Sequence, residues 1–284
     1  MFAFSVSQKI FVARQINRLL RLGRGLLGRD MHVRCRRGGV HWMLDLNEGI
    51  DLSIYLLGAY EPRSLRAYER LLGPGAVVFD IGANIGAHTL HFARLAGPTG
   101  RVFAFEPTDF ACAKLRANLA LNPALAGRVS LQQFFLVADR SVTPPATVAA
   151  SWPVAGDHGA VNAWHGRAEG STAAVAVTAD DFCAQVGLDR LDFVKLDVDG
   201  HEWAVLQGFR ASLARFRPVI LVELAPFIYA GDKAREFDDF VKFLAGLGYR
   251  FTDANTGRAI PHGADDLRRT VIPGGGINAI LLPR

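Results

Sequence analysis

The stretch Val77-Val-Phe-Asp80-Ile-Gly82-Ala-Asn84-Ile-Gly86 decides the expected fold of this 284-residue chain. Three apolar residues lead into an acid, two glycines follow, and residues 87–95 then have the composition of a helix. A short apolar run before glycine-rich punctuation is typical of a buried strand. Small residues after it let a ligand approach the backbone closely. In an open α/β sheet, a nucleotide-like ligand is expected at such a strand-to-helix turn.

A second strand is predicted at Arg101-Val-Phe-Ala-Phe-Glu106-Pro107. Glu106 follows the glycine turn by roughly 20 residues, where a carboxylate can accept hydrogen bonds from two ribose hydroxyls. The turn itself reads Gly-x-Asn-x-Gly, so Asn84 replaces the middle glycine of a dinucleotide fingerprint. Asp80 would repel a pyrophosphate but attract a cationic amino or sulfonium group. The two motifs together favour S-adenosylmethionine over a nicotinamide cofactor.

Composition excludes several classes of protein. Half of the residues are hydrophobic, so a sizeable core is expected and global disorder is not. The net charge is +5, with arginines crowded into the first 40 residues. The three cysteines have neither metal-ligand spacing nor a disulfide pattern, which favours a reducing cytoplasm. No apolar run reaches the roughly 18 residues that span a bilayer, and charges within the first apolar region argue against a secretory signal.

Residues 1–57 are predicted to form an N-terminal extension, with the main domain over 58–284. The extension begins with a basic amphipathic helix at 9–27, followed by a hairpin at 32–46 and a helix at 51–58. The apolar face of the first helix could pack on the domain or on a second subunit. It could also bind an anionic membrane surface or belong to a mitochondrial presequence. One broad face holds the apolar residues Phe11, Val12, Ile16, Leu19, Leu20, Leu22, Leu26 and Leu27, with arginines opposite.

A third strand is predicted at Val129 to Val137, with Asp139 just beyond its end. Prolines and glycines then break residues 141–175 into an irregular insertion. A long insertion with aromatic residues in a compact domain is often functional, so this segment is a candidate for the acceptor pocket; the alternative is a plain surface excursion. The polar and aromatic candidates within it are Trp152, His158, Asn162, Trp164 and His165.

The segment Leu191-Asp-Phe-Val-Lys195-Leu-Asp197-Val-Asp199-Gly-His201-Glu202 predicts a fourth strand that ends in acids. A fifth strand, residues 218–224, also carries a charge, Glu223. A lysine inside a strand is costly to bury alone, and we expect Lys195 to pair with Glu223 across adjacent strands. The tail predicts a helix at 235–247 and strands at 249–253 and 277–282. With no clear helix between these last strands, an antiparallel end to the sheet is expected.

These motifs, together with Tyr60-Glu61-Pro62, resemble FkbM-type S-adenosylmethionine-dependent methyltransferases from about Gly58 to Pro226. The resemblance implies an α/β, Rossmann-like, seven-stranded class I methyltransferase sheet with helices on both faces. Its strand order would be 3-2-1-4-5-7-6, with strand 7 antiparallel. One departure is Asp199, where the family usually has a glutamate.

The resemblance also assigns candidate residues to S-adenosylmethionine. Asp80, Gly82 and Gly86 would line its methionine part, Glu106 would hold the ribose, and Asp139 would approach the adenine. Asp197 would lie near the amino group and the transferred methyl. Glu61, between two predicted helices, is either a helix-start acid or a lid residue. The remaining cofactor candidates, from within the motifs, are Asn84 and Pro107.

The family mainly methylates hydroxyl oxygens, often on sugars or natural products. Methyl transfer to an alcohol needs the acceptor held in line and its proton removed. Asp197, His201 and Glu202 are the candidates for that catalytic role. No cluster has convincing metal-ligand spacing, so no metal is predicted.

Four alternatives stay open at this stage. A nucleic-acid methyltransferase is disfavoured because neither an Asp/Asn-Pro-Pro-aromatic motif nor a Pro-Cys pair occurs, and no nucleic acid is expected as a partner. A protein methyltransferase, an NAD(P)-dependent oxidoreductase and a non-catalytic cofactor-binding scaffold are the others. The favoured partner is a small-molecule or glycan acceptor. The favoured location is the cytoplasm, with residues 9–27 as a contact to a membrane or a subunit; the sequence does not give the oligomeric state.

Overall fold

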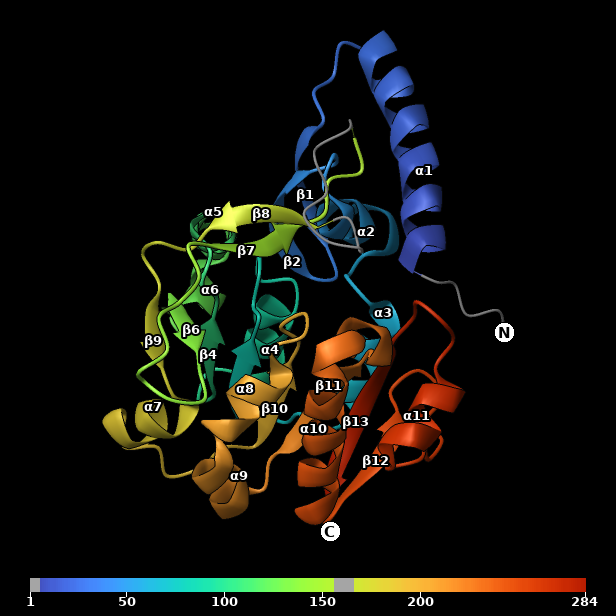
Figure 1. The fold of residues 1–284 in the computed structure, drawn as a ribbon. Coiled ribbons are helices and arrows are strands. Elements are labelled where there is room, and N and C mark those ends of the chain that lie inside the picture. The colour runs from blue at the N-terminus through green and yellow to red at the C-terminus, as the bar shows by residue number, and fades with distance from the viewer. Residues whose placement is uncertain (1–5, 156–165) are drawn as a thin grey trace.

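A seven-stranded mixed sheet forms the centre of the computed structural model, which describes residues 6–155 and 166–284 (Figure 1). The strand order is β12-β13-β11-β10-β3-β4-β5, which is the predicted order taken from the opposite edge. Strand β13 runs antiparallel to both of its neighbours, whereas the other pairs are parallel. The predicted α/β topology is therefore confirmed. The strands are β3 (Val77–Ile81), β4 (Arg101–Phe105), β5 (Val129–Gln132), β10 (Phe193–Leu196), β11 (Val219–Leu224), β12 (Tyr249–Asp253) and β13 (Ile277–Pro283).

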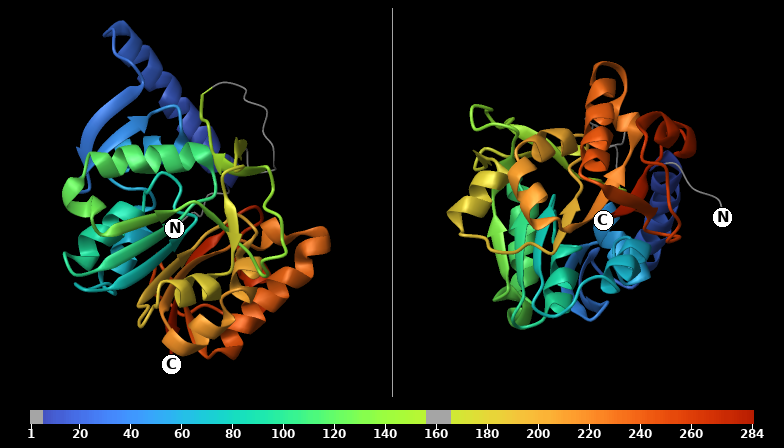
Figure 2. Two further views of the ribbon diagram at one scale, coloured as in Figure 1. Left: turned by 90° about the vertical axis from the view of Figure 1, so that its left-hand side faces the viewer. Right: turned by 90° about the horizontal axis from the view of Figure 1, so that it is seen from below.

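Helices cover both faces of the sheet because successive side chains of each strand point to opposite sides (Figures 1 and 2). Val77, Phe79 and Ile81 of β3 pack against one helical layer, in a cluster with Phe182, Phe209 and Phe240. Val78 packs on the other side with Tyr68 and Phe92. The first layer contains α7 (Ala179–Gln185), α8 (Glu202–Gln207), α9 (Arg210–Phe216) and α10 (Ala234–Gly246), and the second α3 (Pro62–Glu69) and α4 (Thr89–Ala96). Beside them, α5 (Asp109–Ala120) and α6 (Pro123–Ala126) follow β4.

The N-terminal extension shares a hydrophobic cluster with the turn after β3 and with α4. Trp42, Leu44 and Leu52 pack there against Ile85 and Leu90, from the turn after β3 and from α4. The extension therefore sits over the carboxyl end of β3, where the predicted site lies. Its elements are α1 (Val6–Leu26), β1 (His32–Arg37), β2 (Val40–Asp45) and α2 (Gly49–Leu57).

The insertion is more regular than expected. The predicted third strand ends at Gln132, and β6 (Phe134–Leu136) leaves the main sheet to pair with β9 (Val175–Val177). Between them, β7 (Thr147–Ser151) and β8 (Arg167–Gly170) form an antiparallel ribbon. Two short 3₁₀ turns, η1 (Pro226–Tyr229) and η2 (Gly231–Lys233), follow β11.

The expectation of a helix-free connection between the last two strands is wrong. Helix α11 (Ala264–Thr270) lies between β12 and β13. Asp265 and Asp266 occupy its first turn, and Arg268 and Arg269 pair with them at i,i+3, which favours a short helix in spite of its few apolar residues.

Within residues 6–155 and 166–284, the structure contains no helix with the length and apolar character that crossing a membrane requires.

Candidate functional site

A cavity of about 610 Å³ opens at the carboxyl ends of β3, β4, β10 and β11. We call the loops that follow these strands the floor of the cavity. The roof consists of residues 9–16 of α1, residues 49–57 of α2 and residues 148–154 around β7. The predicted site thus lies between the sheet and a roof formed by the N-terminal extension and by the insertion predicted to bind the acceptor.

The glycines of the β3 turn are required by close packing of the floor. Gly82 has a φ of +78°, and a Cβ placed on it would lie 1.9 Å from the backbone oxygen of Asp197. Gly86 has a φ of +86°, and its Cβ would lie 2.4 Å from Cδ1 of Leu115. Gly82 lines the cavity, whereas Gly86 is not among the described lining residues. Gly86 therefore shapes the turn and does not form its surface.

Glu106 is buried in the floor, with one edge toward the cavity. Its Oε1 accepts hydrogen bonds from the backbone N and the Oγ1 of Thr108, at 2.9 and 2.6 Å, and its Oε2 accepts one from the backbone N of Asn84, at 2.9 Å. Burial raises the pKa of Glu106, and these hydrogen bonds oppose the rise. A carboxylate oxygen has more than one acceptor position, so this fixed carboxylate could still accept from a ligand. The next residue, Pro107, also lines the cavity.

Asn84 joins the floor to the roof. Its Nδ2 donates to the backbone oxygen of Ala150 in β7, at 2.8 Å, and its Oδ1 accepts from the backbone N of Ile85. The backbone of Asn84 has a positive φ of +47°. Glu61 (+47°) and Asp199 (+49°) have nearly the same value. Within the described ranges only four non-glycine residues have positive φ, and these three line the cavity. Strained backbone of this kind concentrates at functional sites.

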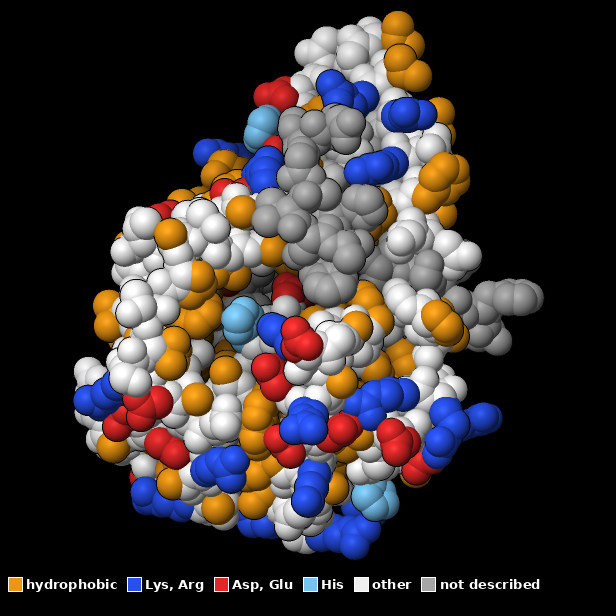
Figure 3. Space-filling model, in the orientation of Figure 1, with side chains coloured by type: hydrophobic (Ala, Val, Ile, Leu, Met, Phe, Trp, Pro, Cys, Tyr) orange, Lys and Arg blue, Asp and Glu red, His pale blue; other side chains and the backbone are white. Residues whose placement is uncertain are grey.

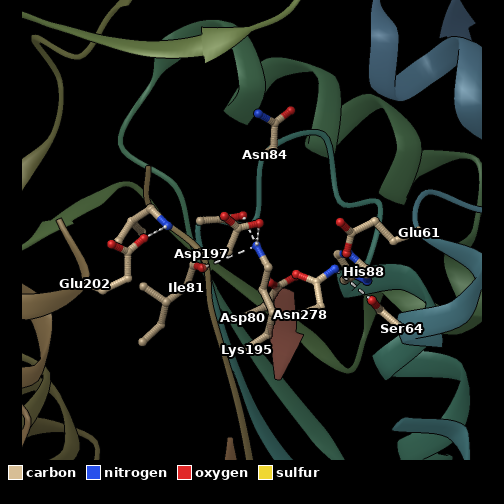
Figure 4. A network of polar contacts seen from close by, with 12 residues as sticks. Glu61, Ser64, Asp80, Ile81, Asn84, His88, Lys195, Asp197, Glu202 and Asn278 are labelled. Carbon is tan, nitrogen blue, oxygen red and sulfur yellow. Dashed lines mark hydrogen bonds and ion pairs between the residues drawn. The ribbon is translucent and has the colours of Figure 1, made fainter. Parts of the chain in front are cut away.

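Lys195 holds the centre of the floor together (Figure 4). In the parallel register it lies opposite Asp80, and its Nζ is 3.9 Å from Oδ1 of Asp80 and 3.3 Å from Oδ2 of Asp197. Nζ also donates to the backbone oxygen of Gly82, at 2.8 Å. Burial alone would lower the pKa of Lys195, but the two carboxylates raise it above its ordinary value. The predicted ion pair between Lys195 and Glu223 is therefore wrong. The strand register places Leu221 beside Lys195, and the ammonium group of Lys195 pairs with Asp80 and Asp197 instead.

Asp80 lies beneath the cavity and not at its surface. It is fully buried, and its Oδ2 accepts from Oγ1 of Thr89 at 2.5 Å. Its Oδ1 has no hydrogen-bond partner among the described residues. Burial raises the pKa of Asp80, and Lys195 opposes the rise. Asp80 thus acts on the cavity through Lys195 and through the charge it adds to the floor.

Acidic side chains of the cavity lining influence one another's ionisation. Burial, and then the charge of Asp197, raise the pKa values of Glu61, Asp199 and Glu223. Like charges that share a poorly hydrated space resist ionisation, so a cation among them is strongly favoured. The described lining includes five carboxylates (Glu61, Glu106, Asp197, Asp199 and Glu223) against two lysines (Lys9 and Lys195). This imbalance suits a ligand with positive charge at one end.

His88 is a candidate site residue that the sequence analysis missed. It is only 4% exposed and lines the cavity. Its Nδ1 is 3.2 Å from the hydroxyl of Tyr68, while its Nε2 has no hydrogen-bond partner among the described residues and lies 3.9 Å from Oε2 of Glu61. Burial lowers the pKa of His88 well below its ordinary value, so the ring is neutral near pH 7. A histidine between the glycine turn and the first helical residue, Thr89, was the available clue.

Of the three catalytic candidates after β10, His201 and Glu202 have different positions. His201 lines the cavity with its ring edge-on to Phe135, and burial lowers its pKa. Glu202 is buried and is absent from the described lining. It accepts hydrogen bonds from the backbone N of Val198 and of Gly200, and from the hydroxyl of Tyr229. The structure therefore makes Glu202 a support for the Asp197–His201 loop, because its carboxylate turns back to the backbone of that loop.

Two further predictions concern the insertion. Asp139 is exposed, accepts a hydrogen bond from the backbone N of Ser141, and is not brought to the cavity. Trp152 does line the cavity. The remaining candidates of this segment, His158, Asn162, Trp164 and His165, lie outside the described residues.

No group of three or more His, Cys, Asp or Glu side chains in the described part of the chain is arranged to hold a metal ion.

Comparison with known proteins places these features in a family. The family model "Methyltransferase FkbM domain" matches residues 80–251. The 2-O-methyltransferase NoeI of Sinorhizobium fredii is 26% identical over 197 residues, which are 61% of this chain and 77% of NoeI. The 31-O-demethyl-FK506 methyltransferase FkbM of Streptomyces tacrolimicus is 55% identical over 58 residues, 20% of this chain and 22% of that protein. The hexuronic acid methyltransferase AglP of Haloferax volcanii is 27% identical over 51% of this chain, and the match spans about half (54%) of AglP.

Proposed function

The chain belongs to the FkbM methyltransferase family, and from this premise we propose that it transfers the methyl group of S-adenosylmethionine to a hydroxyl oxygen of a saccharide or hydroxylated natural product. The observation that carries this proposal is the set of carboxylates that line the cavity. Glu106 follows β4 and is fixed by hydrogen bonds, whereas burial and the charge of Asp197 raise the pKa values of Glu61, Asp199 and Glu223.

The residues present fit S-adenosylmethionine. Glu106 is rigidly held and has acceptor capacity toward the cavity, as a ribose diol needs. The crowded carboxylates Glu61, Asp197, Asp199 and Glu223 gain stability from a cationic amino or sulfonium group. S-adenosylmethionine, when bound, supplies an electrophilic methyl group. The protein has to position the acceptor hydroxyl and to take its proton.

His88 is the group best placed to take that proton. In the tautomer whose Nδ1–H donates to Tyr68, Nε2 carries the free lone pair. This nitrogen is buried and has no hydrogen-bond partner among the described residues, in a residue that lines the cavity. The low pKa of His88 keeps this nitrogen unprotonated near pH 7. After proton transfer, the carboxylate of Glu61, 3.9 Å from Nε2, would stabilise the imidazolium. His201 lines the cavity without an ion pair to a carboxylate in the described ranges, so its role as the base is the weaker hypothesis.

The names of the relatives suggest which acceptors to test. AglP is named for a hexuronic acid, NoeI for 2-O-methylation, and FkbM for a hydroxyl of an FK506 derivative. Purified protein would be incubated with methyl-labelled S-adenosylmethionine and a panel of hexuronic acids, neutral sugars and hydroxylated natural products. Label transfer to an oxygen supports the proposal. Binding of NAD(P) in place of S-adenosylmethionine by isothermal titration would overturn it.

A matched pair of histidine variants tests the proton acceptor. We expect His88→Asn to lower kcat by about 10²–10⁴-fold, the usual contribution of a general base, with the Kd for S-adenosylhomocysteine changed less than about twofold. His201→Asn serves as the control and should retain most activity. Because the pKa of His88 lies below its ordinary value of 6.5, the acid limb of the wild-type rate profile should fall below pH 6.5. Loss of activity in the His201 variant alone would transfer the role to His201.

A further inference from the structure

The outer face of α1 is apolar and uncovered. Phe11, Leu19, Leu22 and Leu26 are 63%, 71%, 68% and 89% exposed, and at 100° per residue they lie on one side of the helix. Figure 3 shows apolar side chains along the outer edge of this helix, with basic side chains beside them. A contiguous exposed apolar stripe on a helix marks an interaction site more often than a chance exposure.

The helix packs on the protein through its opposite side. Asn17 is 1% exposed and its Nδ2 donates to the backbone oxygen of Leu46, at 2.8 Å. Ala13 and Leu20 pack on the cluster of the extension. Most of the apolar residues that the sequence places on one face of α1 are therefore exposed and do not pack on the domain. The helix is held in place by a different side, and its apolar stripe is left for a partner.

The charges on α1 identify the kind of partner. The helix has no Asp or Glu, whereas it carries Lys9, Arg14, Arg18, Arg21 and Arg24. Arg18 and Arg21 are exposed on the flank of the apolar stripe. A second copy of α1 packed on this stripe would bring the basic residues of both helices together, with no acid in either helix to offset them. An anionic surface would be complementary to the arginines and would accept the leucines.

We propose that the outer face of α1 binds the surface of an anionic lipid bilayer, with the helix axis parallel to the membrane plane. Leucine and phenylalanine side chains enter the boundary between head groups and acyl chains, and flanking arginines extend to the phosphates. Each basic residue near an anionic surface adds a favourable electrostatic contribution that salt weakens. This surface is separate from the cavity chemistry, and binding to it needs neither cofactor nor acceptor.

Bilayer binding would have a consequence for the acceptor. Val12 is both exposed and part of the cavity lining, and so are Leu56 and Leu57 at the end of α2. The bound protein would hold this apolar side of the cavity against the membrane, which suits an acceptor whose polar head is anchored by a lipid. This consequence rests on the proposed function, whereas the membrane binding itself does not.

Co-sedimentation of the full chain with vesicles tests the proposal. One vesicle contains phosphatidylcholine mixed with phosphatidylglycerol, and the other contains phosphatidylcholine alone. We expect binding to the anionic vesicle that weakens with added salt, and at least about tenfold weaker binding to the neutral one. The triple variant Leu19→Glu/Leu22→Glu/Leu26→Glu should lose binding by at least about tenfold.

A matched control replaces three exposed apolar residues away from α1, in the variant Leu71→Glu/Val186→Glu/Ile272→Glu. It should bind vesicles as the wild type does. Thermal unfolding of both triple variants checks that their folds are intact, and Arg18→Gln/Arg21→Gln should reduce the preference for anionic lipid.

Equal binding of both triple variants to anionic vesicles, or no binding by the wild type, overturns the proposal. A wild-type dimer in light scattering that the α1 variant disperses, without vesicle binding, would assign the stripe to a second copy. Because sedimentation needs no methyl transfer, its failure leaves the proposed function untouched.

Discussion

The floor and the roof of the cavity are built differently. In the floor, four strand ends meet so closely that backbone touches backbone, as Gly82 and Asp197 do, and a buried lysine ties the strands together. In the roof, side chains of α1, α2 and the β7 segment meet the cavity, with few hydrogen bonds to the floor such as that from Asn84 to Ala150. A floor of this kind fixes one ligand geometry, whereas a roof of side chains can change by substitution without altering the sheet. We infer that the floor serves the cofactor and the roof the acceptor.

The largest effect is expected from a methyl group placed in the tightly packed floor. Gly82→Ala adds a Cβ that would lie 1.9 Å from the backbone oxygen of Asp197, at a φ of +78°. Neither backbone can yield easily, so we expect a loss of about 3–5 kcal/mol in the free energy of unfolding and no measurable binding of S-adenosylhomocysteine. Gly127→Ala is the matched control, because φ there is −64° and nothing lies within 4 Å of the added atom. Denaturant unfolding measures both, and equal stability of the two variants would contradict the tight floor.

The same difference explains what the sequence could reveal. Floor residues sit in short strand-and-turn motifs, where Asp80, Gly82, Glu106 and Asp197 fall at strand ends that a parallel sheet must bring together. Local pattern carries this information because each of these strands is short, apolar and followed closely by its functional residue. The reversed strand β13 and its place in the sheet were implied by the family resemblance, and the structure confirms both.

Features that depend on register or tertiary packing were not predictable in this way. The partner of Lys195 depends on which residue of β3 lies beside it, and the pairing of strands, not their composition, selects Asp80. Periodicity identified the apolar stripe of helix α1 but left open what it faces, and only the structure shows that the helix packs through Asn17. His88 has no motif of its own and is identified by its unpaired Nε2 near Glu61.

Acid provides a second test, at the contact between α4 and the N-terminal extension that carries part of the roof. His91 of α4 is buried beneath the β1–β2 hairpin of the extension, its ring centroid 6.2 Å from that of Trp42, and neither ring nitrogen has a partner among the described residues. Burial lowers the pKa of His91 from 6.5 to about 4. Between these values the unfolded chain binds more protons than the folded one. The free energy of unfolding should therefore fall as the pH drops from 6.5 toward 4, by about 3 kcal/mol for this group.

Replacing His91 with leucine should flatten part of that decline. The variant removes the titrating ring and two unpaired buried nitrogens, so its stability at pH 7 should change little or rise. The control is His41→Leu, at an exposed position in the same hairpin, which should keep the wild-type pH dependence. Urea unfolding at several pH values measures the slope. If the free energy of unfolding of His91→Leu depends on pH as that of the wild type does, the titration of His91 does not cause the decline.

The smallest effect is expected for a substitution in the roof, and it tests directly whether floor and roof bind different ligands. Trp152 belongs to the roof, and its side chain lines the cavity far along the chain from the floor motifs. If the roof serves the acceptor, Trp152→Ala should change the Kd for S-adenosylhomocysteine by no more than about twofold. Glu106→Ala removes a buried acceptor from the floor and should weaken the same ligand by about 10–100-fold, the equivalent of about 1–3 kcal/mol. Isothermal titration of both variants against S-adenosylhomocysteine compares the floor with the roof directly, without knowledge of the acceptor. Similar weakening by both substitutions would mean that cofactor binding extends across the cavity, and the acceptor would then have to be sought nearer to α1 and α2.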